Sequence, residues 1–313
     1  MAAVGIDLHE CIDCFVQRDL VHEDTIKEIC KRFRAALLHE ENVVTVNHPV
    51  TVVGALHGQF DDLLNVFAIA GAIPFTNYLF LGNYLNYGSN GLELFCTLMC
   101  YKILYPTKVT LLRGMAELPQ FCEQYGFRAE CFRKYGNYRV YDMVAETFGY
   151  LPLFADVHGK YLCTGGGILP RVTLSNIKEL DRLKAPTTQD VLLWLLVAQP
   201  SDKSYLEHFK PFERDEEFAR FTFSFADVEE FLKADSAERK TPYQLLITTN
   251  SLQPIGDVRP PPLTRRSRRP TAAAGPFGAR RTSLASSGTS AASSSSTPRR
   301  RPPRCTSRRR PPP

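Results

Sequence analysis

Short apolar strands and helical segments alternate strictly through the middle of this sequence, and that order allows few folds. Strands are predicted at residues 50–53, 78–81 and 109–112, with helices between them at 60–70 and 92–104. A parallel strand pair needs a long crossover connection, which is usually a helix. The alternation therefore predicts parallel βαβ units, an α/β fold in which helices cover a sheet.

The flanking segments predict further elements. Apolar residues recur at helical spacing from residue 6 to residue 38, and polar breaks in that pattern indicate two short helices. Two strands at 154–157 and 161–164 are three residues apart, which is hairpin spacing. The remaining predicted elements are helices at 121–135, 138–148 and 228–234 and strands at 221–225 and 243–248.

Composition divides the chain near residue 256. Residues 256–313 hold fourteen Arg, one acidic residue and almost no large apolar side chain; they carry a charge of +13, and residues 1–255 carry −8, for a total of +5. Such a segment buries too little apolar surface to offset the entropy lost on ordering. We expect a folded domain at 1–255 and a disordered, basic Arg/Pro/Ser-rich tail at 256–313.

The Arg-rich runs of this tail leave several functions open. Clustered Arg binds nucleic-acid phosphates without sequence preference, but a nuclear signal or a simply solvated tail has the same composition. Phe277 is the only aromatic residue there, which weakens a base-stacking role.

The nine cysteines are odd in number and show no disulfide framework, which favours reduced thiols in a cytoplasmic or nuclear protein. Cys11 and Cys14 lack a second Cys or His pair at zinc-site spacing, so core packing on a helix explains them better than a metal does. The longest apolar run, residues 191–198, is too short to span a membrane, and we expect no membrane partner.

Glycine flanks the loops that follow the predicted strands. In open α/β sheets, function concentrates on the loops at the carboxyl ends of strands, and glycine allows the backbone to turn tightly or to approach a ligand there. The four loops of this kind are residues 54–59, 81–88, 112–117 and 163–170.

These loops and the sequence around them resemble the phosphoprotein phosphatase family of metal-dependent serine/threonine phosphatases, most of all its type 2A, 4 and 6 catalytic subunits. The resemblance covers residues 7–250 and includes residues 43–67, 77–82, 105–114, 133–137, 150–153 and 180–183. It implies a metallophosphatase fold, a central β-sandwich flanked by helices with two divalent metal ions at one edge. Members of the family continue beyond the 243–248 strand with further core strands, so we expect the sandwich to be incomplete at its C-terminal strands.

The resemblance also assigns positions to the six metal ligands of the family, and only one ligand is retained. The His of the Gly-Asp-x-His-Gly motif is His57. The other five ligand positions hold Ala55, Asn83, Met115, Gly165 and Tyr243, of which Asn83 stands where the family has a carboxylate that bridges the two ions.

Residues that the family uses for proton transfer and phosphate binding are replaced as well. The general-acid His is Ala116, and the Asp that orients it is Asn86. One phosphate-binding Arg is Tyr87, and the second falls near Glu217. The Glu that follows the general acid is retained as Glu117.

Two closely spaced divalent ions need anionic oxygen ligands to offset their mutual repulsion and to lower the pKa of the attacking water. The resemblance with these replacements therefore implies no working metal site, no bound cofactor and no donor for the leaving oxygen. The leading hypothesis is a pseudophosphatase that binds phosphatase scaffold or regulatory subunits, or phosphoproteins. The rivals are an active phosphoserine/phosphothreonine phosphatase and a nonfunctional truncated remnant.

Structural explanations compete with functional ones at the retained and replaced positions. His57 is explained by hydrogen bonding and Glu117 by capping or pairing with a neighbour. The tyrosines Tyr84, Tyr87 and Tyr243 form either an aromatic pocket or packing in the vacated space, and packing is the favoured explanation. The glycines at 165–167 lack the Lys and Ser/Thr of a nucleotide loop.

Overall fold

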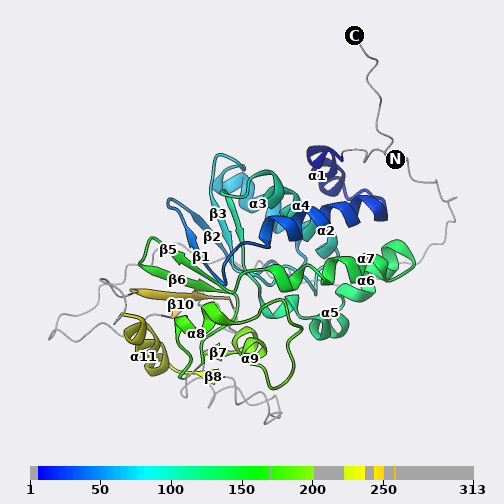
Figure 1. Cartoon of the computed structure of the whole chain (residues 1–313). Helices are drawn as coiled ribbons and strands as arrows, with labels where there is room; N and C mark the ends of the chain where they lie inside the picture. The colour runs from blue at the N-terminus through cyan, green and yellow to red at the C-terminus, as the bar shows by residue number, and fades with distance from the viewer. Residues whose placement is uncertain (1–5, 170, 201–221, 237–242, 250–256, 259–313) are drawn as a thin grey trace, which may run out of the picture. The chain divides into compact units, whose positions relative to one another are not determined.

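Three parallel strands, β2 (Thr51–Val53), β3 (Tyr78–Phe80) and β4 (Val109–Leu111), pair in that order. The computed structural model describes residues 6–169, 171–200, 222–236, 243–249 and 257–258, all within a first unit of residues 1–266 (Figure 1). The strands alternate with helices along the chain, so the predicted parallel βαβ units are confirmed.

Both faces of this sheet are buried because its residues alternate between two cores. Tyr78 and Phe80 pack against the helices of the N-terminal half, whereas Leu79 points into the space between the two sheets. This period of two explains why β3 is apolar throughout.

Helices cover the outer face of the three-stranded sheet. The two predicted N-terminal helices are α1 (Leu8–Val16) and α2 (Glu23–Leu37), and both pack on α4 (Gly91–Leu104). Helix α4 is enclosed and therefore apolar on nearly all sides. The other helical elements of this layer are α3 (Phe60–Ala70), η1 (Met115–Glu117), α5 (Pro119–Tyr125), α6 (Phe127–Tyr135), α7 (Arg139–Ala145) and η2 (Phe148–Tyr150).

The helix predicted at 121–135 is two helices. Gly126 ends α5 and precedes α6 with a φ of 111°, a left-handed conformation that a continuous helix cannot contain. The apolar periodicity continues across this break because both helices bury the same side, at Cys122, Phe127 and Cys131.

A second, mixed sheet has the order β1-β5-β6-β9-β10. Its strands are β1 (Val43–Val46), β5 (Phe154–Val157), β6 (Tyr161–Thr164), β9 (Leu245–Thr248) and β10 (Asp257–Val258). β5 and β6 form the predicted hairpin, β1 runs parallel to β5, and β9 runs parallel to β6. β10 lies beyond residue 255, so the first unit continues past the domain boundary that composition predicts.

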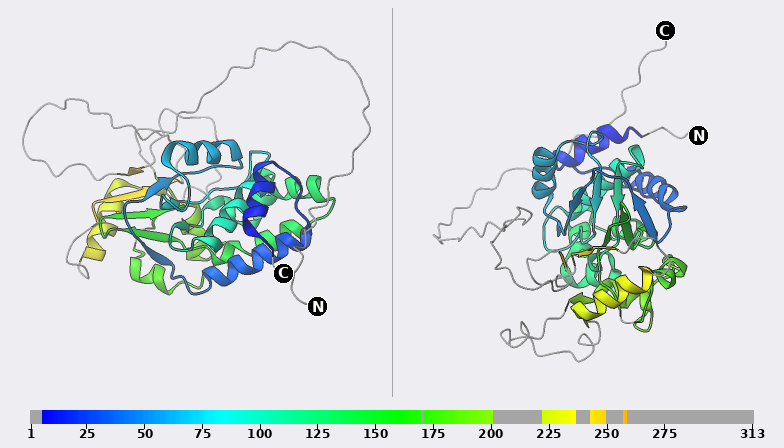
Figure 2. Two further views of the ribbon diagram at one scale, coloured as in Figure 1. Left: turned by 90° about the horizontal axis from the view of Figure 1, so that it is seen from above. Right: turned by 90° about the vertical axis from the view of Figure 1, so that its left-hand side faces the viewer.

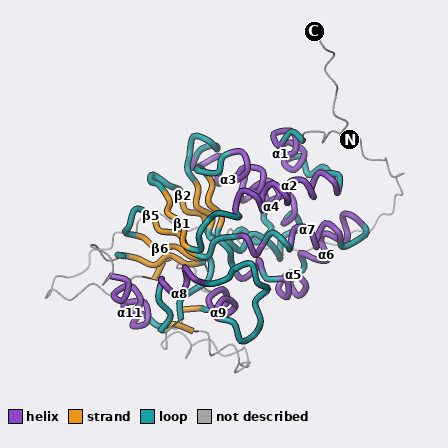
Figure 3. The backbone as a smooth tube through the Cα atoms, in the orientation of Figure 1, coloured by secondary structure: helices purple, strands orange, loops and turns teal. Residues whose placement is uncertain are grey.

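The remaining helices cover the outer face of this second sheet. Helices α8 (Leu174–Glu179), α9 (Val191–Val197) and α11 (Phe225–Ser236) share a core with Phe154, Leu162 and Leu246. Two short strands, β7 (Gln199–Pro200) and β8 (Thr222–Phe223), pair beside them. Figures 2 and 3 show the strands at the centre of the unit, with the N-terminal helices on one side and α8, α9 and α11 on the other.

A small third core lies between the two sheets. It contains Val46, Leu79, Leu81, Leu112, Ala155, Val157 and Cys163, which come from strands of both sheets or from the residues directly after them. The predicted metallophosphatase fold, a β-sandwich flanked by helices, is therefore confirmed. Within the described ranges, none of the helices is both long and apolar enough to cross a membrane.

Candidate functional site: the loops after β2, β3, β4 and β6

The glycine-flanked loops after β2 and β3 are joined by backbone hydrogen bonds. The N–H groups of Leu56 and His57 both donate to the carbonyl oxygen of Asn83, over 3.1 and 2.9 Å. The N–H of Gly88 donates to the carbonyl oxygen of His57 over 2.8 Å. The carboxyl ends of neighbouring parallel strands thus bring their loops together, as the strand order predicts.

Left-handed backbone conformations gather in these loops. Of the seven non-glycine residues with positive φ in the described part of the chain, four are His57, Asn83, Asn86 and Tyr87. Such conformations cost on the order of 1–3 kcal/mol each and persist only where surrounding contacts hold them. The loops are therefore held tightly by the rest of the fold.

Glu117 is the main polar link between the loops after β3 and β4. Its side chain is fully buried and accepts hydrogen bonds from the N–H groups of Asn83 (2.8 Å), Tyr84 (2.8 Å) and Gly114 (2.9 Å). Burial raises the pKa of Glu117, against the opposing effect of these hydrogen bonds and of Arg113. Burial also lowers the pKa of Arg113 to about 10. The side chain pairs with neighbouring groups, as the structural explanation of Glu117 predicts.

Asn83 uses both ends of its carboxamide within the protein. Its Oδ1 accepts the N–H of Ala116 over 2.9 Å, and its Nδ2 donates to Oγ1 of Thr249 over 3.1 Å. The hydroxyl of Thr249 donates onward to the carbonyl oxygen of Gly165 over 3.2 Å. These partners assign the orientation of the amide, because only Oδ1 can accept from a backbone N–H.

Asn86 is buried and links the β3 loop to α6. Its Oδ1 accepts the N–H of Phe127 over 3.2 Å, and its Nδ2 donates to the carbonyl oxygen of Ala116 over 3.4 Å. Ala116 is itself buried.

Gly165 lies against the backbone of the other sheet. It forms a parallel bridge with Gly114, and a Cβ atom at position 165 would lie 2.1 Å from the carbonyl oxygen of Leu81 and 2.6 Å from that of Arg113. Both contacts are far shorter than real Cβ contacts, and both are to backbone, which cannot move aside cheaply. The structure therefore admits only glycine at this position in this arrangement.

The three tyrosines do not form one pocket. Tyr84 is fully buried in the helical core, where its ring lies 5.4 Å from that of Phe95. Tyr87 is 65% exposed and lies edge-on to His57, with 5.2 Å between the ring centroids. Tyr243 belongs to the core of α8, α9 and α11. Tyr84 and Tyr243 therefore pack in two separate cores, and neither fills a shared space vacated at the loops.

Tyr243 lies at the far end of the five-stranded sheet from these loops. It precedes β9, whose first residue, Leu245, pairs with Tyr161 beside the hairpin turn. Its phenol donates to the carboxylate of Asp156 over 3.0 Å. The assignment of a ligand position to residue 243 is therefore corrected, because the carboxyl end of β9, and not its start, reaches the loops.

Thr249 is the residue that β9 brings to this edge, and sequence reasoning missed it. It directly follows β9, which pairs with β6 so that Thr248 lies opposite Thr164. Alignment of sequence motifs cannot find it, because the register of β9 on β6 is a tertiary feature. The position near Glu217 falls outside the described residues.

The side chains at this edge do not fit a site for two divalent ions. Ala55 and Gly165 offer no donor, and Met115 packs against the apolar core under α8 and α9. Both ends of the neutral amide of Asn83 are hydrogen-bonded to protein groups. Of the ligand positions that lie at this edge, His57 is then the one with a side chain able to bind a metal ion. In the described part of the chain, no group of three or more His, Cys, Asp or Glu side chains is arranged to hold a metal ion.

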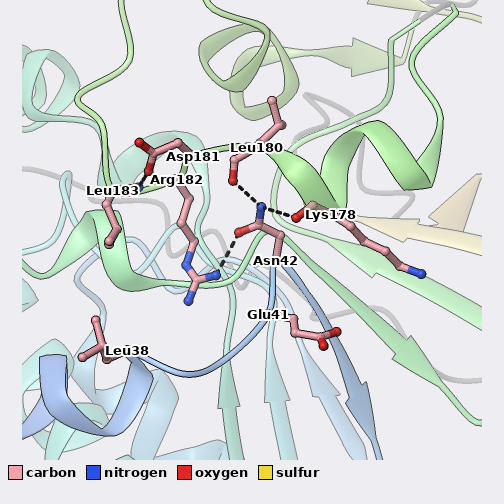
Figure 4. A pocket seen from close by; sticks show the side chains of 8 residues that line it. All are labelled: Leu38, Glu41, Asn42, Lys178, Leu180, Asp181, Arg182 and Leu183. Carbon is pink, nitrogen blue, oxygen red and sulfur yellow. Dashed lines mark hydrogen bonds between the residues drawn. The ribbon is translucent and has the colours of Figure 1, made fainter.

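A hollow of about 400 Å³ lies elsewhere, between the end of α2 and the segment after α8. Figure 4 shows Asn42 at its centre, where Nδ2 donates to the carbonyl oxygens of Lys178 and Leu180 and Oδ1 accepts from Arg182. Arg182 also donates to the carbonyl oxygen of Tyr150 over 3.1 Å. These polar groups hydrogen-bond to one another and so connect the segment after α2 with the segment after α8. The hollow is therefore explained by structure.

Comparison with known proteins agrees with this architecture. The Metallophos family, described as calcineurin-like phosphoesterase, matches residues 48–239, more than half of the chain. A structure of a serine/threonine phosphatase from Saccharomyces cerevisiae, described as similar to human phosphatase PP5, superposes with a TM-score of 0.66 at 26% identity. The superposition covers 77% of this chain and 75% of that one.

Curated relatives are serine/threonine phosphatases. The chain is 38% identical over 232 residues to the serine/threonine-protein phosphatase 4 catalytic subunit of Kluyveromyces lactis, covering 74% of this chain and 73% of that protein. It is 40% identical over 195 residues to a protein phosphatase 2A catalytic subunit of Dictyostelium discoideum, covering 62% of each.

Proposed function

Since the chain belongs to the calcineurin-like phosphoesterase family and is a serine/threonine-phosphatase-like protein, we propose that it is a noncatalytic member that acts by binding. The family framework is present in both sheets and in the helices that cover them.

The state of Asn83 carries this proposal. A bridging carboxylate offsets the repulsion between two divalent ions, and a neutral amide does not. Asn83 is buried, and both ends of its amide are hydrogen-bonded to protein groups, the N–H of Ala116 and the hydroxyl of Thr249. These contacts support a protein that folds and acts without a metal cofactor.

Proton transfer supports the same proposal. Hydrolysis of a phosphate ester needs a donor for the leaving oxygen, and general acids contribute about 10²- to 10⁴-fold to rates. Ala116 and Asn86 stand at the positions that the resemblance assigns to the general acid and its orienting partner, and neither provides a proton of suitable pKa.

Partners of the phosphatase type fit the retained framework. The names of the relatives from K. lactis and D. discoideum describe them as catalytic subunits, and a subunit is one part of an assembly. A chain with the same framework and no turnover would compete with such subunits for their scaffold or regulatory partners. Holding a phosphoprotein without hydrolysing it is the second form of the same hypothesis.

The first experiment measures turnover of a phosphoserine peptide by the purified chain, with and without MnCl₂, beside the K. lactis relative as a matched positive control. We expect no turnover above the buffer rate. Turnover that a chelator suppresses would replace the proposal by an active metal-dependent phosphatase.

The second experiment measures binding. Purification of the endogenous protein, followed by identification of copurifying chains, should recover phosphatase scaffold or regulatory subunits, and added K. lactis catalytic subunit should displace the chain from them. A protein that melts cooperatively but recovers neither these subunits nor phosphoproteins contradicts the binding role. Aggregation without a cooperative melt would favour the truncated remnant.

A further inference from the structure

A directed chain of hydrogen bonds crosses from one sheet to the other at the edge where the loops meet. The N–H of Ala116 donates to Asn83 Oδ1 (2.9 Å), Asn83 Nδ2 donates to Thr249 Oγ1 (3.1 Å), and Thr249 Oγ1 donates to the carbonyl oxygen of Gly165 (3.2 Å). Asn83 and Ala116 follow strands of the three-stranded sheet. Gly165 and Thr249 follow strands of the five-stranded sheet, so the chain joins the two.

Backbone contact between the sheets occurs at the same place. Gly114 and Gly165 form a parallel bridge, although they follow β4 and β6 of different sheets. A Cβ atom at position 114 would lie 2.6 Å from both the backbone nitrogen and Oδ1 of Asn83. The two glycines allow an approach that no other residue pair permits.

Asparagine satisfies both neighbours at position 83, whereas aspartate cannot. An ionised carboxylate is an acceptor only, so it could bind the Ala116 N–H but could not donate to Thr249. Thr249 would then have to donate to the carboxylate, and the carbonyl oxygen of Gly165 would lose its donor.

Charge adds to this mismatch. Glu117 Oε2 accepts the backbone N–H of Asn83 over 2.8 Å, so an aspartate at 83 would place a second buried carboxylate beside the first. Arg113 is buried nearby, but its Nε donates to the backbone carbonyl oxygen of Glu117 over 3.3 Å. Two like charges in a low-dielectric interior repel strongly unless a cation compensates them.

We propose that Asn83, Thr249, Gly114 and Gly165 form a metal-independent interlock that holds the two sheets together at this edge. This inference rests on the proposed function, because it explains how a noncatalytic member dispenses with metal ions that would otherwise join the same loops. Restoring the acidic residue of the family at position 83 weakens the fold and does not repair the site.

The test is thermal unfolding of four full-length variants at pH 7.5, with and without MnCl₂. Asn83→Asp is expected to lower the melting temperature by about 4 to 10 °C, whereas Asn47→Asp, the same change at an exposed residue between β1 and β2, leaves it within about 1 °C. Thr249→Val removes the hydroxyl and is expected to lower it by about 2 to 6 °C, while Thr249→Ser keeps the hydroxyl and stays near wild type.

Opposite results overturn the interlock. The proposal is contradicted if Asn83→Asp has the same melting temperature as Asn47→Asp. It is also contradicted if MnCl₂ raises the melting temperature of Asn83→Asp above that of wild type. If Asn83→Asp does not fold, equal stability of the Val and Ser variants at 249 contradicts it. These readouts are independent of turnover and partner binding: a wild type that hydrolyses phosphopeptide refutes the proposed function, whereas unchanged melting temperatures refute the interlock alone.

Discussion

Glycine at position 165 is a steric requirement of the contact between the two sheets. A methyl group there meets the backbone oxygens of Leu81 and Arg113, whereas at Gly54, in the same group of loops, it meets only the Cγ2 of Thr249 at an ordinary 3.7 Å. Any metal-ligating side chain at this position, one of the six ligand positions that the family resemblance assigns, would carry the same clash through its Cβ atom. Ligand restoration therefore requires the sheets to separate first.

We predict that Gly165→Ala destabilises the protein by about 1–3 kcal/mol, because overpacking against fixed backbone costs that much. Urea denaturation measures the free energy of unfolding. The matched control Gly54→Ala should lie within about 0.5 kcal/mol of wild type. Equal stability of the two variants would show that the contact at 165 is not as tight as described.

Glu117 is the residue whose removal should loosen the loops most directly. In Glu117→Gln, the amide NH₂ replaces one acceptor and faces backbone N–H groups of Asn83, Tyr84 or Gly114. We predict a loss of about 1–3 kcal/mol in the free energy of unfolding at pH 7.5, since a buried donor is left without its partner. The exposed Glu123→Gln is the control.

The pH dependence of stability gives a separate prediction for Glu117. Because its folded pKa is raised, the carboxyl keeps its proton in the folded protein after the unfolded chain has released it near pH 4.5. Its contribution to stability is therefore full below that value and declines as the pH rises toward the folded pKa. The advantage of wild type over Glu117→Gln should shrink from pH 4 upward through this window, measured by urea denaturation at several pH values. If the stability difference between wild type and Glu117→Gln grows with pH instead, the pKa of Glu117 is not raised in the folded protein.

At the scale of elements, helices α1, α2 and α4 form a core rich in thiols. Cys11, Cys30, Cys96 and Cys100 are buried there, and burial raises the pKa of Cys30 to about 12. The thiolate is the reactive form, so burial and the raised pKa both suppress reaction. The prediction from the sequence that Cys11 and Cys14 belong to helix packing agrees with this core.

We predict that iodoacetamide at pH 8 leaves Cys30, Cys96 and Cys100 unmodified in the folded protein, while the half-buried Cys14 on α1 reacts. Peptide mass spectrometry after timed labelling measures each site. Mild denaturant should expose the three together, since they lie in one packed helical layer. Rapid native labelling of Cys96 would mean that α4 is not enclosed.

For the whole molecule, the two sheets and their helices should form a cooperative unit without bound metal. A ligand that binds only the folded state at about a hundred times its Kd adds roughly 2.7 kcal/mol, a shift of several degrees. We predict that MnCl₂ leaves the melting temperature of wild type unchanged. An upward shift of several degrees that His57→Ala abolishes would contradict this prediction and the metal-free proposal with it.

Local pattern was enough to predict the parallel βαβ units, both N-terminal helices and the hairpin of β5 and β6, whereas the sandwich was predicted from the resemblance to the phosphatase family. Period and glycine placement depend on neighbouring residues, so they can be seen in the sequence. The break at Gly126 and the strands β1, β7 and β10 escaped this approach, whereas β8 and β9 lie within strands that the pattern predicts. A left-handed break leaves the apolar spacing intact, and the two-residue strands β7 and β10 carry too little pattern to stand out.

The sequence by itself also determined which side chains are present at the loop edge: a neutral Asn83, no side chain at Gly165 and a retained Glu117. Only the tertiary structure decided what they do. In that structure Tyr243 lies at the far end of its sheet, and Thr249 lies between Asn83 and Gly165. Gly165 lies directly against the backbone of Leu81 and Arg113. The reason is physical: these contacts join residues more than 80 positions apart or in different sheets, and their distances follow from strand register and sheet packing, which no local pattern encodes.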